Sequence, residues 1–157
     1  MKEQTGQTLL EILLALGASV MILSAIAVIV VSSLNSTRFT KNQNLANQYA
    51  QEGIEIVRRT RDSGGWAGFP AGTYCLSSGS TSLPASSVPP CATANVGIFI
   101  RQIDIIASDC PGAGGGPSGS RVKSKVSWID GKCPANDYCH KVELVSCFYN
   151  INQVAAP

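Results

Sequence analysis

The hydrophobic pattern of the chain begins with one long apolar run. Residues 9–31 are almost wholly apolar. About 23 residues at 1.5 Å per residue give a helix of roughly 35 Å, which is enough to cross a hydrocarbon core of about 30 Å. The hydrophobic regions of signal peptides are shorter, on the order of 7–15 residues. The length of the run therefore predicts a retained membrane helix.

The pattern predicts that this helix continues beyond the apolar run. Residues 32–62 contain no proline, and their only glycine is Gly53. Apolar or aromatic residues recur there at helical spacing, and polar residues fill most of the other face. The stripe consists of Leu34, Phe39, Leu45, Tyr49, Gly53 and Ile56. With the glycine pair at 64–65 as a stop signal, we expect one helix from about Thr8 to about Arg61, on the order of 80 Å long.

After the helix, the pattern changes to strands and loops. Residues 97–106 are rich in isoleucine, which is typical of a buried strand, and residues 121–129 and 140–148 alternate between apolar and polar positions. The loop 130–139 joins the last two as an antiparallel hairpin. We therefore predict an α+β fold, in which a long N-terminal helix, with a membrane-spanning half and then an amphipathic half, packs on a small antiparallel β-sheet head with disulfides.

The cysteines indicate where the head is located. The chain has 157 residues, a net charge of +2 and six cysteines, all of which follow the helix. An even set of cysteines after an apolar span indicates oxidation outside the cytoplasm, so we expect the N-terminus inside and the head outside. The candidates for disulfides are Cys75, Cys91, Cys110, Cys133, Cys139 and Cys147.

One disulfide follows from chain geometry. Cys133 and Cys139 lie at the tip of the predicted hairpin, where a short loop brings them together, so we predict that they pair. The pairing of the other four stays open, and one arrangement joins Cys75 to Cys91 and Cys110 to Cys147. A zinc site is the alternative to this disulfide, because His140 directly follows Cys139 and could bind the metal together with the two cysteines. There is no second close cysteine pair and no second histidine, so we expect no metal site.

The start of the helix carries an unusual charge. A carboxylate within a membrane span costs about 2.5–3.5 kcal/mol on insertion scales, and Glu11 lies inside the apolar run. Alternatively, Glu11 reaches the headgroups and favours the positive end of the helix. The segment Gly6-Gln7-Thr8-Leu9-Leu10-Glu11 resembles the N-terminal motif of type IV pilins and pseudopilins. In that family a short polar leader ends in glycine, and a glutamate follows at the start of a long apolar helix.

The resemblance implies a maturation and assembly route. A prepilin peptidase would cut between Gly6 and Gln7, and Glu11 would become the fifth mature residue. In the family this glutamate pairs with the N-terminal amine of a neighbouring subunit, so Glu11 and Thr8 are assigned to assembly. The family usually has Phe where Gln7 stands, which leaves N-methylation open. Many major pilins also have a proline near the place of Val28, so this helix is expected to stay straight.

The resemblance also implies an organisation and a set of partners. The expected segments are a leader at 1–6, a membrane or filament-core helix at 7–31, an amphipathic continuation at 32–62 and a β-rich head at 63–157. The partners would be prepilin peptidase, the inner-membrane assembly platform, membrane lipid before assembly and other pilin subunits. The product would be an extracellular filament of a type IV pilus or a type II secretion-like pseudopilus, with this chain as a minor subunit.

Other functions are weighed against a filament subunit. The main alternative is a secreted or singly anchored disulfide-rich binding module that does not assemble. An enzyme is not expected, because the chain has one histidine, no paired carboxylates in context and no Cys-x-x-Cys motif, and we expect no cofactor. The basic strand face of Arg121, Lys123 and Lys125 leaves DNA as a less favoured partner, because such a face is usually solvated.

Overall fold

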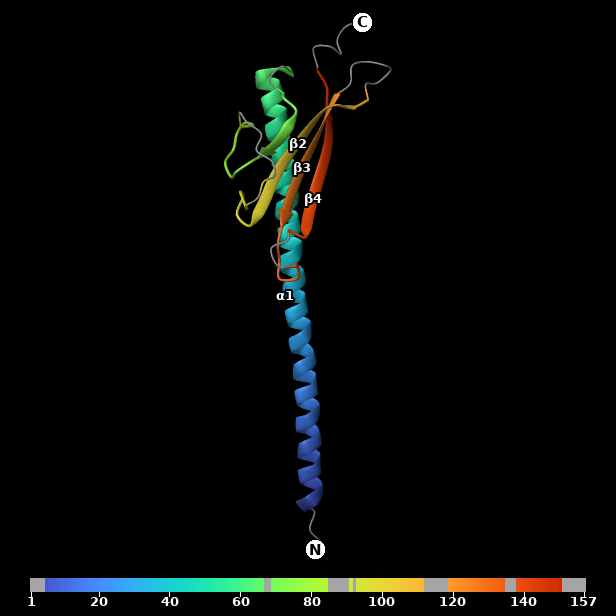
Figure 1. Cartoon of the computed structure of the whole chain (residues 1–157). Helices are drawn as coiled ribbons and strands as arrows, with labels where there is room; N and C mark the ends of the chain where they lie inside the picture. The colour runs from blue at the N-terminus through green and yellow to red at the C-terminus, as the bar shows by residue number, and fades with distance from the viewer. Residues whose placement is uncertain are drawn as a thin grey trace. The chain divides into compact units, whose positions relative to one another are not determined.

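The computed structural model describes residues 5–66, 69–84, 91, 93–111, 119–134 and 138–150, with side chains from residue 8 onward. One helix and four strands occur in the order α1 (Thr5–Gly64), β1 (Gly72–Cys75), β2 (Phe99–Cys110), β3 (Gly119–Trp128) and β4 (His140–Phe148) (Figure 1). The chain divides into two compact units, Met1–Asn42 and Gln43–Pro157, which are treated separately below. The predicted α+β fold is confirmed.

The predicted continuous helix is also confirmed. Helix α1 begins at Thr5 and ends at Gly64. Gly65 follows with φ +66°, a left-handed conformation that ends helices and that glycine adopts without steric cost. Every residue from 8 to 41 is exposed. Leu34 and Phe39, the first two residues of the predicted stripe, are among them.

The four strands form one antiparallel sheet in the order β1-β2-β3-β4. The predicted hairpin between β3 and β4 is confirmed, with Lys125 opposite Glu143. Strand β2 extends to Cys110, four residues beyond the predicted end, through an irregularity in which Ser108 has φ 56°. Strand β1 was not predicted, because a strand of four residues is too short to show an alternating pattern.

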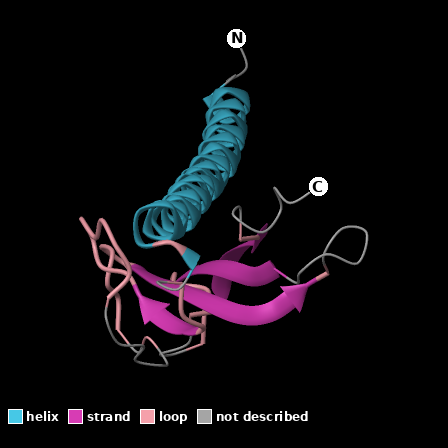
Figure 2. Ribbon diagram, turned by 90° about the horizontal axis from the view of Figure 1, so that it is seen from above, coloured by secondary structure: helices cyan, strands magenta, loops and turns pink. Residues whose placement is uncertain are grey.

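Within the second unit, α1 lies across one face of the sheet (Figure 2). The approach is closest at Gly53, where an added Cβ would lie 2.6 Å from Oγ of Ser124 and 2.8 Å from Cδ1 of Ile103. Small or branched side chains on either side of Gly53 complete the contact. On the helix they are Ala46, Ala50, Ile56 and Val57, all buried. Glycine and alanine remove bulk between helix and sheet, which lets the two backbones pack closely.

The contact between helix and sheet divides into two apolar clusters. One groups Ala46 and Ala50 with aromatic and branched residues of the sheet, Phe99, Val126 and Trp128. The other groups Ile56 and Val57 with Phe69, Tyr74, Leu76, Ile103, Ile105, Val122 and Phe148. Leu45 and Tyr49 of the predicted stripe flank the first cluster and are only partly buried. Gly53 and Ile56 of the predicted stripe are buried, whereas in the two turns before them the buried residues are Ala46 and Ala50, each one position after a predicted residue.

Candidate functional site

The N-terminal residues singled out by the sequence lie at the start of α1. Gly6 and Gln7 are in its first turn, and Thr8 and Glu11 follow on exposed positions. The neighbours of Glu11 are apolar and open, with Leu10 61 % and Ile12 60 % exposed. Glu11 is therefore a single carboxylate in the exposed apolar part of α1, and it forms no salt bridge with any residue that the structure describes.

The exposed part of α1 has the length and composition of one membrane span. An 18-residue window reaches a mean hydropathy of 2.7, and none of that window is buried. A helix of the core of a water-soluble protein would instead bury most of its apolar side chains. By length and composition, this helix could cross a membrane once.

The head contains three disulfides. They join Cys75 to Cys91, Cys110 to Cys147 and Cys133 to Cys139, at sequence separations of 16, 37 and 6. The predicted hairpin disulfide is thus present, and the arrangement that had been left open for the other four cysteines is the one found. Two of the bridges include a residue of a strand, Cys75 of β1 or Cys110 and Cys147 of β2 and β4, and the third closes the loop between β3 and β4. All three restrict the unfolded chain.

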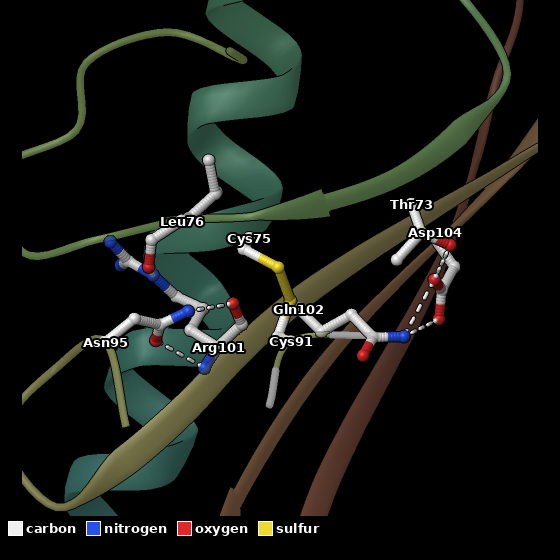
Figure 3. The surroundings of a disulfide bond; sticks show 8 residues. All are labelled: Thr73, Cys75, Leu76, Cys91, Asn95, Arg101, Gln102 and Asp104. Carbon is white, nitrogen blue, oxygen red and sulfur yellow. Dashed lines mark hydrogen bonds between the residues drawn. A yellow bond between two sulfur atoms is a disulfide. The ribbon is translucent and has the colours of Figure 1, made fainter. Parts of the chain in front are cut away.

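A buried arginine links the helix, the sheet and the loop after β1. Arg101 of β2 is fully buried, its Nη1 lies 2.8 Å from Oε2 of Glu52 on α1, and its Nη2 donates to the carbonyl of Ser77 at 2.7 Å. Asn95 accepts from the backbone N–H of Arg101 and donates to its carbonyl (Figure 3). Buried charges are stable only when paired and hydrogen-bonded, so this network holds the helix in place over β2.

The network of Arg101 was missed in the sequence. Arg101 stands in an isoleucine-rich segment, where a single basic residue is easily taken for an exposed position. Its partners are far away in the chain. Glu52 lies on the helix, and Leu76 follows β1 and accepts a hydrogen bond from Nε of Arg101 with its carbonyl at 3.2 Å. Only the tertiary fold brings these groups together.

The opposite face of the sheet carries the basic residues of β3. The register places Lys123 opposite Asp104 and Lys125 opposite Glu143. Arg121 forms an ion pair with Asp109 at 3.0 Å. Because acidic residues alternate with the basic ones across the strands, this face does not present one strong positive field to a polyanion.

An open groove runs between α1 and the free edge of β4. It has a volume of about 650 Å³ and is lined by residues of α1 between 48 and 59 and by residues 144–146 of β4. Its charges are mixed, because Glu55 pairs with Arg58 at 2.9 Å and with Arg59 at 3.5 Å. Nothing in this groove resembles a catalytic arrangement of acid, base and nucleophile within the described residues.

The loop between β3 and β4 gathers four potential metal-binding side chains. The ligand atoms of Asp130, Cys133, Cys139 and His140 all lie within 4.8 Å of one another. Oδ2 of Asp130 is 3.0 Å from Nε2 of His140. The backbone N–H of Lys132 donates to Asp130 and lowers the pKa of its carboxyl, and His140 adds to this effect. Asp130 was not a predicted site residue, since its role depends on the turn that brings it back to His140.

Comparison with known proteins adds no identification. No protein-family model matches the chain, and neither a curated protein nor a solved structure shows significant similarity to it.

Proposed function

We propose that this chain is a structural filament subunit of the type IV pilin class, a minor subunit of a type IV pilus or of a type II secretion-like pseudopilus. The observation that carries the proposal is the single helix α1, whose exposed apolar residues lead without interruption into the segment packed on the sheet. An apolar helix that is uncovered in the subunit needs lipid or other copies of itself as its surroundings. A filament built by transfer of this helix from the membrane to a helical core provides both.

The position of Glu11 supports the same proposal. Cleavage after Gly6 would create an α-amine four residues before this carboxylate. In an apolar filament core, a lone carboxylate and a lone amine are each unfavourable, whereas an amine–carboxylate pair between subunits offsets part of that cost. The pair would also fix the stagger between neighbouring helices. The proposed partners are therefore other pilin subunits, with prepilin peptidase and an assembly platform in the membrane acting before them.

The mature N-terminus tests this proposal. Mass spectrometry of protein recovered from the cell envelope and from sheared filaments should give Gln7 as the first residue. Gly6→Val should leave the full-length precursor in the membrane, because the peptidase requires a small residue there. Gly17→Val is the matched control, since the added side chain meets open space and lies away from the cleavage site. Cleavage near residues 32–36 would instead discard the helix and overturn the proposal in favour of a secreted binding module.

A further inference from the structure

The loop between β3 and β4 contains, beside its disulfide, two further side chains that can bind a metal ion. The hairpin-loop cluster comprises Asp130, Cys133, Cys139 and His140, and its ligand atoms lie within 4.8 Å of one another. Two sulfurs, one imidazole nitrogen and one carboxylate oxygen form a donor set that tetrahedral zinc accepts. We propose that the cluster is an alternative metal site, which binds one divalent cation of the zinc class when the Cys133–Cys139 disulfide is reduced.

The geometry requires only local movement. The sulfurs of a disulfide lie about 2 Å apart, and two thiolates on one zinc ion lie about 3.8 Å apart, as follows from Zn–S bonds of about 2.3 Å. The sulfurs must therefore separate by about 2 Å. The carboxylate oxygen of Asp130 and the ring nitrogen of His140 are already 3.0 Å apart. Both cysteines lie outside β3 and β4, so neither belongs to the residues paired in the register of the sheet.

Neighbouring groups already orient the two non-sulfur ligands. The ring of His140 stacks on Trp128 with a centroid distance of 5.4 Å, and the backbone N–H of Lys132 donates to Oδ1 of Asp130 at 2.8 Å. The other carboxylate oxygen of Asp130 faces Nε2 of His140. Outer contacts of this kind fix the direction of metal ligands and raise affinity. A random pair of thiols in an unfolded chain would lack them.

Reduction of the Cys133–Cys139 disulfide requires an external reductant. A phosphine reductant supplies two electrons and becomes a phosphine oxide with the oxygen of one water molecule, and the two protons of that water convert the sulfurs of the broken S–S bond into two thiols. Metal binding then releases these two protons as the thiolates form bonds to the cation. The disulfide and the metal site exclude each other, so a bound cation would hold the loop closed in a newly made chain and would have to leave before the disulfide forms.

The hairpin disulfide is accessible to such a reductant. Cys139 is exposed and Cys133 is half-buried, whereas each of the other two bridges includes a buried cysteine, Cys91 or Cys110. Cys147 is exposed as well, so alkylation followed by mass mapping identifies which bridge a mild phosphine has opened, and only chains with the Cys133–Cys139 bridge open are used.

The test is a Co²⁺ titration of the full chain in detergent micelles after this mild reduction. Co²⁺ serves as the visible probe for zinc, and Zn²⁺ should displace it. We expect one Co²⁺ per chain with thiolate charge-transfer and tetrahedral d–d absorption, and no such spectrum from the oxidised chain. Cys133→Ser with Cys139→Ser should abolish the spectrum. The matched control, Cys75→Ser with Cys91→Ser, should retain it.

Two single variants separate a built site from thiol chelation. His140→Gln and Asp130→Asn should each weaken Co²⁺ binding by about tenfold or more, since each removes one ligand or its orientation. Tryptophan fluorescence checks that the variants keep the packing of Trp128. Unchanged affinity in both variants would overturn the proposal, because two thiols alone would then account for binding. An opened wild-type bridge that gives no tetrahedral spectrum would overturn it as well. The result does not depend on whether the chain assembles into a filament.

Discussion

The ion pair between Glu52 and Arg101 gives the sharpest prediction about stability, because α1 contains a matched control. Glu52 and Glu55 lie one turn apart, and their side chains are 47 % and 41 % exposed. Their partners differ. Arg101 is fully buried, whereas Arg58 and Arg59 are more than half exposed. Replacing each glutamate by glutamine keeps the shape and removes the same charge, so the difference in cost reports the burial of the partner.

The structure sets the expected magnitudes. Removing one partner of a fully buried ion pair costs about 3–5 kcal/mol, and removing a surface pair costs about 0.2–1 kcal/mol. Water reaches Glu52, and Arg101 keeps its hydrogen bonds to the carbonyls of Leu76 and Ser77. We therefore expect Glu52→Gln to lower the free energy of unfolding by about 1–3 kcal/mol. Glu55→Gln should lower it by less than about 0.5 kcal/mol.

Urea unfolding of the full chain in detergent micelles measures the difference. Trp128 is 1 % exposed in the cluster beside Ala46, so its fluorescence reports separation of helix and sheet. The same midpoint for both glutamine variants would refute the reasoning, because it would mean that Arg101 gains nothing from Glu52 beyond a surface contact. In the double variant with Arg101→Met, replacement of Glu52 should cost much less, since the buried charge is then gone.

Three further predictions concern assembly and the head. Glu11→Ala should insert into the membrane more readily, by up to about 2.5–3.5 kcal/mol, yet enter sheared filaments less on immunoblots, and unchanged incorporation would count against the amine–carboxylate pair. Gly119→Ala should destabilise the head by about 1–3 kcal/mol in urea unfolding, because the new Cβ would lie 2.6 Å from the backbone oxygen of Phe148. Gly64→Ala is the control and should not destabilise the head, because its new Cβ meets open space. Replacing both members of the Cys110–Cys147 bridge by serine should lower the free energy of unfolding by about 4 kcal/mol, against about 2 kcal/mol for the Cys133–Cys139 bridge, because the bridges close loops of 37 and 6 residues. Equal losses would show that strain in the folded state or residual structure in the unfolded state dominates.

The elements that the sequence predicted are those defined by long or local patterns. The apolar run and the absence of proline before Asp62 define α1, and alternation over about nine residues defines β3 and β4. The Cys133–Cys139 bridge was predictable because loop length alone brings its ends together. Each of these features depends on residues that are close in the chain, so a pattern in one segment is sufficient.

The missed features depend on residues that are distant in the chain. Ala46 and Ala50 are buried because Phe99 and Trp128 cover them, and alanine by itself is too small to mark a buried face. Arg101 is buried because carbonyls after β1 and a glutamate on α1 receive it. The candidate N-terminal site differs, since a local motif predicts its residues and its proposed partners would belong to other subunits.

The head combines devices that act on different states of the chain. The contact at Gly53 and the pair of Glu52 with Arg101 stabilise the folded state, whereas the three disulfides act mainly by restricting the unfolded chain. This division is reasonable for a unit with few large apolar side chains on its helix, since Ala46, Ala50 and Gly53 bury little surface by themselves. Close approach of the helix therefore depends on small residues, and the stability that they do not provide comes from one buried charge network and from covalent bridges. A change that enlarges the helix face would weaken the packing without affecting the bridges, so such variants should remain cross-linked, compact and loosely packed.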